Sequence, residues 1–319
     1  MDKTVANHIT RSKQARPYRQ KLSDDVFLDL YFKGYTDKEI AEKCGVNKVT
    51  VWKRRKIFNL PPNKKKRFIP IPSPELAYIL GVLDGDGWVR IKKKHHIIAL
   101  SSIDLEFVRK FNESLTKLLN KNKPYSIQIV KPKGKNRKIQ HKVEGICKDF
   151  LEWYYSKSCI KEKHHCIKKY PYDYLKGLYD SEGSIVIDIS HGNAPYLYCR
   201  IFLFNTNLEL LKYIKRLLEK LGFHPRLNKV KSKSKISRFP DYSTIRKKDE
   251  YYIALNRKED IYRFHDKIGF TIDRKQKKLE KWVSLTTTIG TGIKSIKIWA
   301  QSDEKILRKL KNLGGELSD

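Results

Sequence analysis

The stretch GVLDGDGW (residues 81–88) places two acids among glycines at the end of an apolar run, LAYIL (76–80). A second stretch, GLYDSEGS (177–184), repeats this pattern 96 residues further along the chain. Alone, the first stretch is typical of a helix end followed by a turn. Because both copies end in an acid followed by glycine, at Asp86 and Glu182, the pattern indicates a pair of equivalent functional positions.

The elements around the two acids follow one order, which predicts a duplicated module of the α+β class. In each copy an apolar helix ends at the acid, and an alternating strand, a strand running into an amphipathic helix, a third strand and a closing helix follow. The predicted order is α-β-β-α-β-α, with the first closing helix at about residues 144–156. ALSSIDLEFV (99–108) aligns with FLFNTNLELL (202–211), and IKEKHHCI (160–167) with IDRKQKKL (272–279). Two such halves are expected to pack about an approximate twofold axis, as the subunits of a homodimer do.

Charge is the strongest compositional signal, because 69 Lys and Arg stand against 35 Asp and Glu, a net charge of +34. Such an excess opposes compaction unless a polyanion matches it, and the 18 Tyr and 13 Phe among the cations favour nucleic acid. A lysine-rich composition inherited from an AT-rich genome is the alternative explanation. The cysteines are scattered, no signal-peptide pattern is visible, and no apolar run approaches about 20 residues. We therefore expect a soluble intracellular protein, in a prokaryotic cytoplasm or an organelle, with no membrane partner.

Composition divides the chain into five segments. They are an N-terminal arm with a helix-turn-helix domain (1–60), a linker rich in Pro and Lys (61–74), the first repeat (75–170), the second repeat (171–282) and a C-terminal extension (283–319). The extension contains an apolar stretch and a short basic helix candidate. The sequence leaves open whether these cover the core or touch nucleic acid.

Residues 24–58 have the periodicity of a small all-α domain. Thr36, with Glu39 three residues later, forms a capping-box pattern that predicts a helix start. The spacing of a helix-turn-helix falls on Ala41, Gly45 and Val51. The second helix carries the basic side chains that a reader of the DNA major groove would use, Lys53, Arg54 and Arg55. A helical hairpin that binds a protein is the alternative.

Packing of the two apolar helices against each other would bring the two acids together. Gly81 and Gly177 stand at equivalent positions, five residues before each acid, where a missing side chain lets helix backbones approach. Asp86 and Glu182 would then meet at the helix ends, and two close carboxylates repel unless a cation lies between them. Hard oxygen ligands favour Mg²⁺, with Mn²⁺ as a plausible substitute. Two such ions can clamp the attacking and leaving oxygens of a phosphodiester displacement.

With these features in place, ILGVLDGDG (79–87) and LKGLYDSEG (175–183) resemble the two signature motifs of the LAGLIDADG homing endonuclease family, in its single-chain form. The resemblance extends from about residue 75 to about residue 282. It implies sheets that form a saddle over double-stranded DNA, and divalent-metal hydrolysis of both strands across the minor groove, leaving 3′ overhangs. It also implies a monomer with a long, weakly palindromic target, and a metal ligand at the last acid of each motif, Asp86 and Glu182.

The resemblance nominates further residues around the metals. The backbone carbonyls of Gly85 and Ser181 would face the metal ions. A basic residue that acts through water beside each scissile phosphate aligns with Lys163 and Lys275. Near alternatives to these two are Lys161 and Arg274.

Other motif positions are expected to have supporting roles. Asp84 and Asp180, two residues before each acid, are interpreted as structural groups at the helix ends. Residues at matching strand ends that would order water are Ser102 and Asn205. Leu80 and Lys176 stand where the family often has a small residue, so Lys176 should point away from the helix interface.

Strand parity predicts which side chains face the DNA, because alternate residues of a strand point to opposite faces. Val89 and Ile91 are expected to face the helices, as are the three isoleucines of SIVIDIS (184–190). The side chains expected toward DNA are Trp88, Arg90, Lys92, Ser126, Gln128, Ser184, Val186, Asp188, Ser190, Tyr198 and Arg200. Arg, Gln and Asp suit guanine, adenine and cytosine edges respectively. The basic loops 131–138 and 229–238 would contact phosphates.

Two other functions fit the same scaffold. An RNA maturase that assists intron splicing would bind intron RNA, and retention of both acids favours cleavage without excluding this second role. A transcription regulator built on a degenerate copy would have lost at least one acid. The cluster CIKEKHHC (159–166) contains two Cys and two His, but its spacing is unlike that of common zinc sites.

Overall fold

The chain folds into two compact units, Met1–Lys66 and Arg67–Asp319. A computed structural model describes residues 22–63, 68–92, 95–131, 138–190, 194–230, 236–239, 242–245 and 249–312. Most of the two predicted phosphate-binding loops, at 132–137 and 231–235, therefore lies outside the described residues. Within the described residues, no helix is long and apolar enough to cross a membrane.

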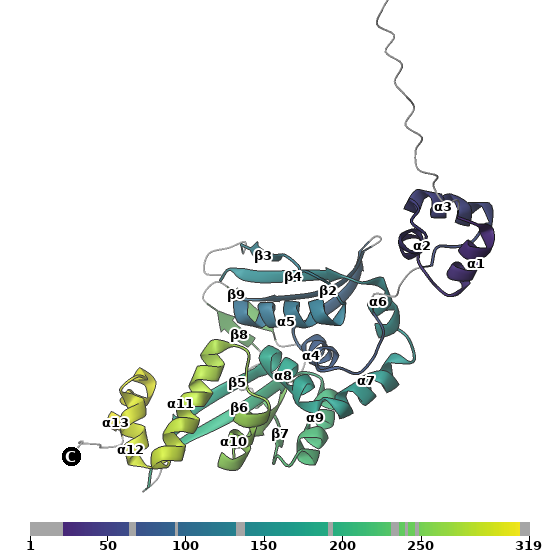
Figure 1. The fold of residues 1–319 in the computed structure, drawn as a ribbon. Coiled ribbons are helices and arrows are strands. Elements are labelled where there is room, and N and C mark those ends of the chain that lie inside the picture. Colours follow the sequence, from purple (N-terminus) through teal and green to yellow (C-terminus); the bar gives the residue numbers. More distant parts are fainter. Residues whose placement is uncertain are drawn as a thin grey trace, which may run out of the picture. The chain divides into compact units, whose positions relative to one another are not determined.

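The first unit is a bundle of three short helices around its own apolar core (Figure 1). The helices are α1 (Asp24–Phe32), α2 (Asp37–Lys43) and α3 (Lys48–Ile57). The buried apolar side chains are Leu22, Phe27, Tyr31, Ile40, Ala41 and Val51. The predicted capping box between Thr36 and Glu39 is present, and Gly45 has a φ of +61° in the turn between α2 and α3. Glycine is favoured there because L side chains rarely adopt this backbone conformation.

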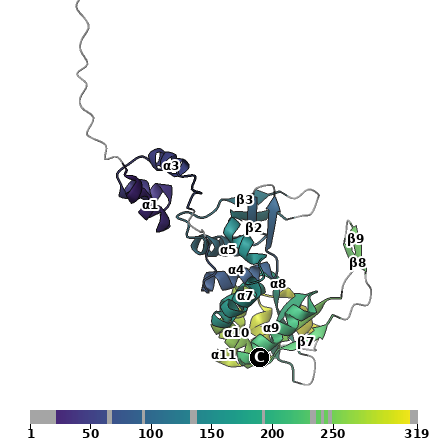
Figure 2. The same ribbon diagram turned by 90° about the vertical axis from the view of Figure 1, so that its right-hand side faces the viewer.

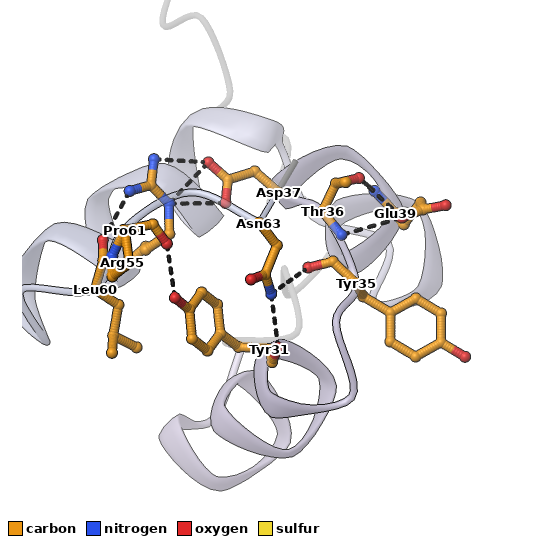
Figure 3. Close-up of polar contacts among 9 residues, drawn as sticks. All are labelled: Tyr31, Tyr35, Thr36, Asp37, Glu39, Arg55, Leu60, Pro61 and Asn63. Atoms are coloured by element: carbon orange, nitrogen blue, oxygen red, sulfur yellow. Dashed lines mark hydrogen bonds and ion pairs between the residues drawn. The ribbon is translucent and has the colours of Figure 1, made fainter. Parts of the chain in front are cut away.

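Polar contacts tie the end of the first unit back to its helices (Figure 3). Asn63 Nδ2 donates to the carbonyls of Tyr31 and Tyr35, at 2.6 and 3.1 Å. Tyr31 Oη donates to the carbonyl of Pro61 at 2.7 Å. Residues 61–63, assigned to the linker from sequence, are therefore tied to this small domain.

The second unit begins with a first copy of the repeated module. Its elements are α4 (Pro74–Leu83), β1 (Trp88–Lys92), β2 (His95–Ser102), α5 (Leu105–Leu118), β3 (Ile127–Val130), β4 (Gln140–Ile146), α6 (Lys148–Tyr154) and α7 (Cys159–Lys169). The strands form an antiparallel sheet in the order β1-β2-β4-β3. Helix α5 covers one face of this first sheet (Figure 1).

The second copy repeats this topology with insertions. Its elements are α8 (Pro171–Glu182), β5 (Gly183–Ile189), β6 (Leu197–Asn205), α9 (Leu208–Lys220), β7 (Arg226–Lys229), β8 (Ile236–Phe239), β9 (Tyr242–Ile245), β10 (Tyr251–Leu255), α10 (Lys258–Lys267) and α11 (Asp273–Ile289). The second sheet has the order β5-β6-β10-β7, the same pattern as the first, and β8 and β9 form an inserted hairpin (Figure 2). The duplicated α+β architecture predicted from sequence is confirmed by this repeated strand order.

Each copy contributes four strands to its sheet, whereas the sequence pattern predicted three. The predicted helix at 144–156 is in fact the end of strand β4 followed by the shorter helix α6. Strand β4 was missed because Lys142 and Glu144 occupy its open face, leaving few apolar positions to show alternation. Strand β7 has four residues, of which only Leu227 is a large apolar one. Apart from the inserted hairpin of β8 and β9, the order within each copy is therefore α-β-β-α-β-β-α-α.

The C-terminal extension packs on the core of the second unit. Helices α12 (Ile293–Ala300) and α13 (Glu304–Asn312) bury Ile296, Trp299 and Ile306 in the main apolar cluster. The sequence left open whether this extension covers the core or touches nucleic acid, and the structure shows that it covers the core.

Candidate functional site

Helices α4 and α8 pack so closely that two glycines are required at their contact. A Cβ atom added to Gly81 would lie 2.1 Å from the carbonyl oxygen of Tyr174. One added to Gly177 would lie 2.3 Å from the carbonyl oxygen of Tyr78. Both clashes are with backbone atoms, which cannot rotate away. The close helix approach predicted from these glycines is therefore present.

A reciprocal pair of hydrogen bonds joins the two helices at the acidic ends of the motifs. Tyr78 Oη on α4 donates to Asp180 Oδ2 at 3.0 Å, and Tyr174 Oη on α8 donates to Asp84 Oδ2 at 2.6 Å. Asp180 is 1% exposed and also accepts the backbone N–H of Thr271 at 2.7 Å. Buried carboxylates need such donors. These two acids thus clamp the helix ends together, which agrees with the structural role predicted for them.

The last acids of the two motifs face a shared site, in which Glu182 is half-buried and Asp86 is more exposed. Asp86 follows α4 in a turn and Glu182 is the final residue of α8. A Cβ added to Gly85 would lie 2.5 Å from Ser181 Cβ and 3.2 Å from Glu182 Cγ, so the two motif ends touch. Burial raises the pKa of Asp86, and burial together with the charge of Asp86 raises the pKa of Glu182 to about 7. The Lys275 ammonium opposes both shifts.

Lys163 and Lys275, which the alignment of the two repeats makes equivalent, have different partners. Lys275 is 7% exposed, and its Nζ donates to the carbonyls of Asp180 and Tyr179 at 3.1 and 3.5 Å. Burial lowers the pKa of Lys275, and the acids around it act in the opposite direction. Lys163 Nζ instead forms an ion pair with Asp84 Oδ1 at 2.6 Å. The charge of Lys275 therefore acts on the paired acids, whereas Lys163 belongs to the helix clamp.

The alternative residues nominated around the acids have local partners. Arg274 forms a bidentate ion pair with Asp104, at 2.8 and 2.9 Å, and Lys161 is exposed on α7. Ser102 and Asn205 end β2 and β6, and each side-chain oxygen accepts the backbone N–H two residues later, at 3.2 and 2.8 Å. These two residues shape equivalent strand-to-helix turns.

The donor set at the paired acids fits a hard divalent cation. Two carboxylates with raised pKa values lie where a positive ion would relieve their repulsion. Over the ranges that the structure describes, no group of three or more His, Cys, Asp or Glu side chains could hold a metal. An ion bound by Asp86 and Glu182 would thus need carbonyl, water or phosphate oxygens, which suits Mg²⁺ or Mn²⁺ better than zinc.

The raised pKa of Glu182 predicts a pH dependence of stability for the metal-free protein. The folded pKa is about 7 against an ordinary value of 4.5, so its contribution to stability is present below pH 4.5 and is lost as pH rises to about 7. Replacing Glu182 by Gln should remove this loss and stabilise the protein at pH 8 by roughly 1–2 kcal/mol, after allowance for solvent screening. Thermal unfolding of both proteins in a chelator from pH 4.5 to 8 measures the difference. Parallel curves would contradict the prediction.

The open face of the first sheet carries several residues predicted to face DNA. Trp88 and Arg90 lie there with Lys142 and Glu144, a pair that the sequence reasoning missed. The Glu144 carboxylate accepts from Arg90 at 3.2 Å and from Lys142 at 2.6 Å. Gln128 is exposed in β3, Ser126 is exposed just before that strand, and only the backbone of Lys92 is described. Ile91 lies on the face of β1 opposite Arg90, as predicted, but near the strand end it is 59% exposed and does not pack in the core.

On the second sheet, one residue predicted to contact a DNA base is instead bound by side chains of the protein. Asp188 is 7% exposed, and its carboxylate binds Lys309 and Lys305 of α13 at 2.7 and 3.1 Å. It anchors the C-terminal helix, whose presence strand parity could not reveal. The other predicted positions, Ser184, Val186, Ser190, Tyr198 and Arg200, are half-buried or exposed.

In the first unit the predicted DNA contacts of α3 divide into exposed and internal side chains. Arg55 is 5% exposed, and its guanidinium binds Asp37 at 2.9 Å and donates to the carbonyl of Leu60 at 2.9 Å (Figure 3). It therefore stabilises the domain, and the prediction that it contacts DNA is wrong. Arg54 forms an ion pair with Asp24. Lys53 is exposed, as a DNA contact requires.

The fold and the paired motifs define a family, and comparison with known families agrees. The LAGLIDADG-like domain family matches residues 73–157 and 170–269, which together make up more than half of the chain. This chain therefore belongs to the LAGLIDADG-like family. In the first unit, the family of terminase ATPase subunits (gpP-like) matches residues 28–57.

Relatives and solved structures are similar to much of the chain. Protein MJ0398 of Methanocaldococcus jannaschii is 32% identical over 246 residues, 76% of this chain and 84% of that protein. MJ0314 of the same organism is 39% identical over 155 residues, 47% of this chain and 56% of that protein. The crystal structure of I-DmoI in complex with DNA and Mn has a TM-score of 0.41 at 17% identity, covering 62% of this chain and 97% of that one. Meganuclease I-AabMI bound to uncleaved DNA has a TM-score of 0.40 at 14% identity, covering 76% and 97%.

Proposed function

We propose that this chain is a site-specific homing endonuclease that cleaves both strands of DNA with a divalent metal. One observation carries the proposal: Asp86 and Glu182 lie together at the ends of two closely packed helices, and burial raises the pKa of both carboxyls. Membership of the LAGLIDADG-like family supports it. The net charge of +34 suits a polyanionic substrate, which would be attracted to the acidic site by the surrounding cations.

Each residue of the site has a separate role in this proposal. Asp86 and Glu182 would hold the cation, with the carbonyls of Gly85 and Ser181 as further oxygen ligands. A bound Mg²⁺ or Mn²⁺ would lower the pKa of a coordinated water and polarise a phosphoryl oxygen. The Lys275 ammonium, beside both acids, would stabilise the negative charge that develops on the phosphate.

The two repeats indicate how the DNA target would be cut and how symmetric it would be. Both copies of the site lie in one chain, so a monomer would suffice for cleavage across the minor groove, leaving 3′ overhangs. The two sheets carry different side chains on their open faces, which implies a long target with only weak palindromic symmetry.

The first unit would add DNA contacts outside the cleavage core. On α3 the exposed side chains are Lys48, Val49, Thr50, Trp52, Lys53, Lys56 and Ile57. A basic helix face with an exposed aromatic residue suits insertion in the major groove. Arg54 and Arg55 hold the helix in place through their ion pairs.

Selection from a randomised duplex library tests the proposed function. The full chain is incubated with the library in Mg²⁺, with Ca²⁺ as the binding control, and cut ends are sequenced. Enrichment of one long site with 3′ overhangs in Mg²⁺ is the expected result. Selective binding without cleavage in both ions would favour a regulator, and selective binding of intron RNA would favour a maturase.

The two lysines should differ in their effects on cleavage. Lys275→Met removes the positive charge beside both acids, and we expect cleavage to fall by about a hundredfold. Lys163→Met leaves the Asp84 carboxylate without its ion pair, so we expect lower thermal stability and a smaller loss of cleavage. Single-turnover cleavage rates and melting temperatures of both variants measure this split. Equal losses of rate at unchanged stability would show that the two lysines act alike.

A further inference from the structure

The open faces of the two sheets differ at equivalent positions. In the second sheet three aromatic side chains, Phe202, Phe204 and Tyr252, stand on the two central strands β6 and β10. We call these three residues the aromatic patch. In the first sheet the equivalent register positions hold Ala99, Ser101 and Lys142. At these three positions the first sheet therefore carries small, polar or charged side chains, whereas the second carries aromatic ones.

The aromatic patch is not part of the core. The alternate residues of the same strands, Ile201, Leu203 and Ile253, are fully buried beneath the sheet. The three rings pack against one another with centroids 5.6–5.7 Å apart and remain half-buried on the opposite face. Covering apolar surface of this kind with a ligand stabilises the complex, because the surface is removed from water.

The position of the aromatic patch indicates that its ligand is DNA. Ser184, two residues after the catalytic acid Glu182, pairs directly with Phe202, so the patch lies on the sheet face that begins beside the acids. Arg200 on the same face of β6 supplies positive charge, 4.4 Å from the ring centroid of Tyr198. The patch is thus continuous with the surface proposed to bind duplex DNA.

In a duplex, the thymine C5-methyl is the distinctive apolar group that the major groove presents. We propose that the aromatic patch reads thymine methyl groups, so that the half-site bound by the second sheet is selected for thymines. The inference rests on the proposed function and adds the chemistry of recognition. The first sheet, with Arg90 held by Glu144, would instead read polar base edges.

Single-stranded RNA is the other nucleic acid that aromatic side chains on a sheet can bind. Stacking on unpaired bases needs exposed ring faces. Here Phe202 and Phe204 lie at an interplanar angle of 30°, and Tyr252 stands at 69° and 41° to them. The three rings thus share no common plane on which successive bases could stack, which suits contact with small methyl groups better than stacking.

Replacing thymine by deoxyuridine tests the proposal, since it removes the methyl and keeps the base pair. The selected target is prepared with deoxyuridine in one half-site or the other, and Kd is measured in Ca²⁺ with the full chain. The half-sites are assigned by the base positions at which Arg90→Ala alters selectivity. We expect a loss of about fourfold per contacted methyl in the half-site of the second sheet, and little change in the other.

Variants of the patch complete the experiment. Phe202→Ala and Phe204→Ala should make binding insensitive to deoxyuridine, whereas Tyr155→Ala, at an exposed tyrosine after α6, should keep the sensitivity. Equal losses in the two half-sites, or unchanged sensitivity in both Phe variants, would overturn the inference. So would tighter binding of a single-stranded RNA copy than of the duplex. Failure to select any duplex target would instead reject the proposed function.

Discussion

Asp86→Asn and Glu182→Gln should each reduce double-strand cleavage by two to three orders of magnitude or more, a loss comparable with removal of a key group that stabilises charge in a transition state. Each substitution keeps the size of the side chain and removes one of the two negative charges that would hold the cation. The neighbouring contacts stay in place, since the helix clamp uses Asp84 and Asp180.

Binding should respond differently from cleavage in these variants. Neutralising an acid on a DNA-facing surface removes repulsion from phosphate, so we expect an unchanged or somewhat lower Kd. Single-turnover cleavage in Mg²⁺ and fluorescence anisotropy in Ca²⁺ separate the two effects. Glu152→Gln, at an exposed acid of α6, is the matched control and should cut normally. Undiminished cutting by both Asp86→Asn and Glu182→Gln would refute the assignment of the site.

The parts of the fold that carry the motifs could be predicted from sequence because their signals are local. The two acid-glycine pairs, the capping box at Thr36 and the amphipathic helices α5 and α9 each leave a pattern within a few residues. Strands β4 and β7 leave no such pattern, because β4 is polar on its open face and β7 has only four residues. Their existence follows from sheet pairing, which joins distant segments.

The roles of single charged residues could not be predicted because their partners are distant in sequence. Asp188 was expected to face DNA from its strand parity, and it does lie on the open face, but α13 brings lysines to it. Arg55 lies in a basic helix yet binds Asp37, 18 residues earlier. The alignment of the two repeats placed Lys163 and Lys275 at equivalent positions. It did not reveal that Asp84 forms an ion pair with Lys163 and not with Lys275. A side chain's role is set by its neighbours in space.

Gly81→Ala should destabilise the second unit strongly and also weaken cleavage. The added Cβ would lie 2.1 Å from the backbone carbonyl oxygen of Tyr174, so the helices α4 and α8 must separate. Alanine gains up to about 1 kcal/mol in helix propensity. Overpacking against a backbone atom should cost about 3 kcal/mol or more, which outweighs that gain. At the size of the second unit, a net loss of about 2 kcal/mol corresponds to a fall in melting temperature of roughly 4–8 °C.

The same separation should reach the active site, because the helices that part at Gly81 carry Asp86 and Glu182 at their ends. Gly177→Ala, whose Cβ would lie 2.3 Å from the carbonyl oxygen of Tyr78, should behave alike. Gly292→Ala is the control without a clash, since no heavy atom lies within 4 Å of its added Cβ. Because Gly292 is the N-cap of α12, we expect a loss of about 1 kcal/mol there, smaller than the loss at Gly81. Equal melting temperatures for the three variants would show that α4 and α8 tolerate a wider spacing. If cleavage were also retained, the metal site would not depend on close contact between the helices.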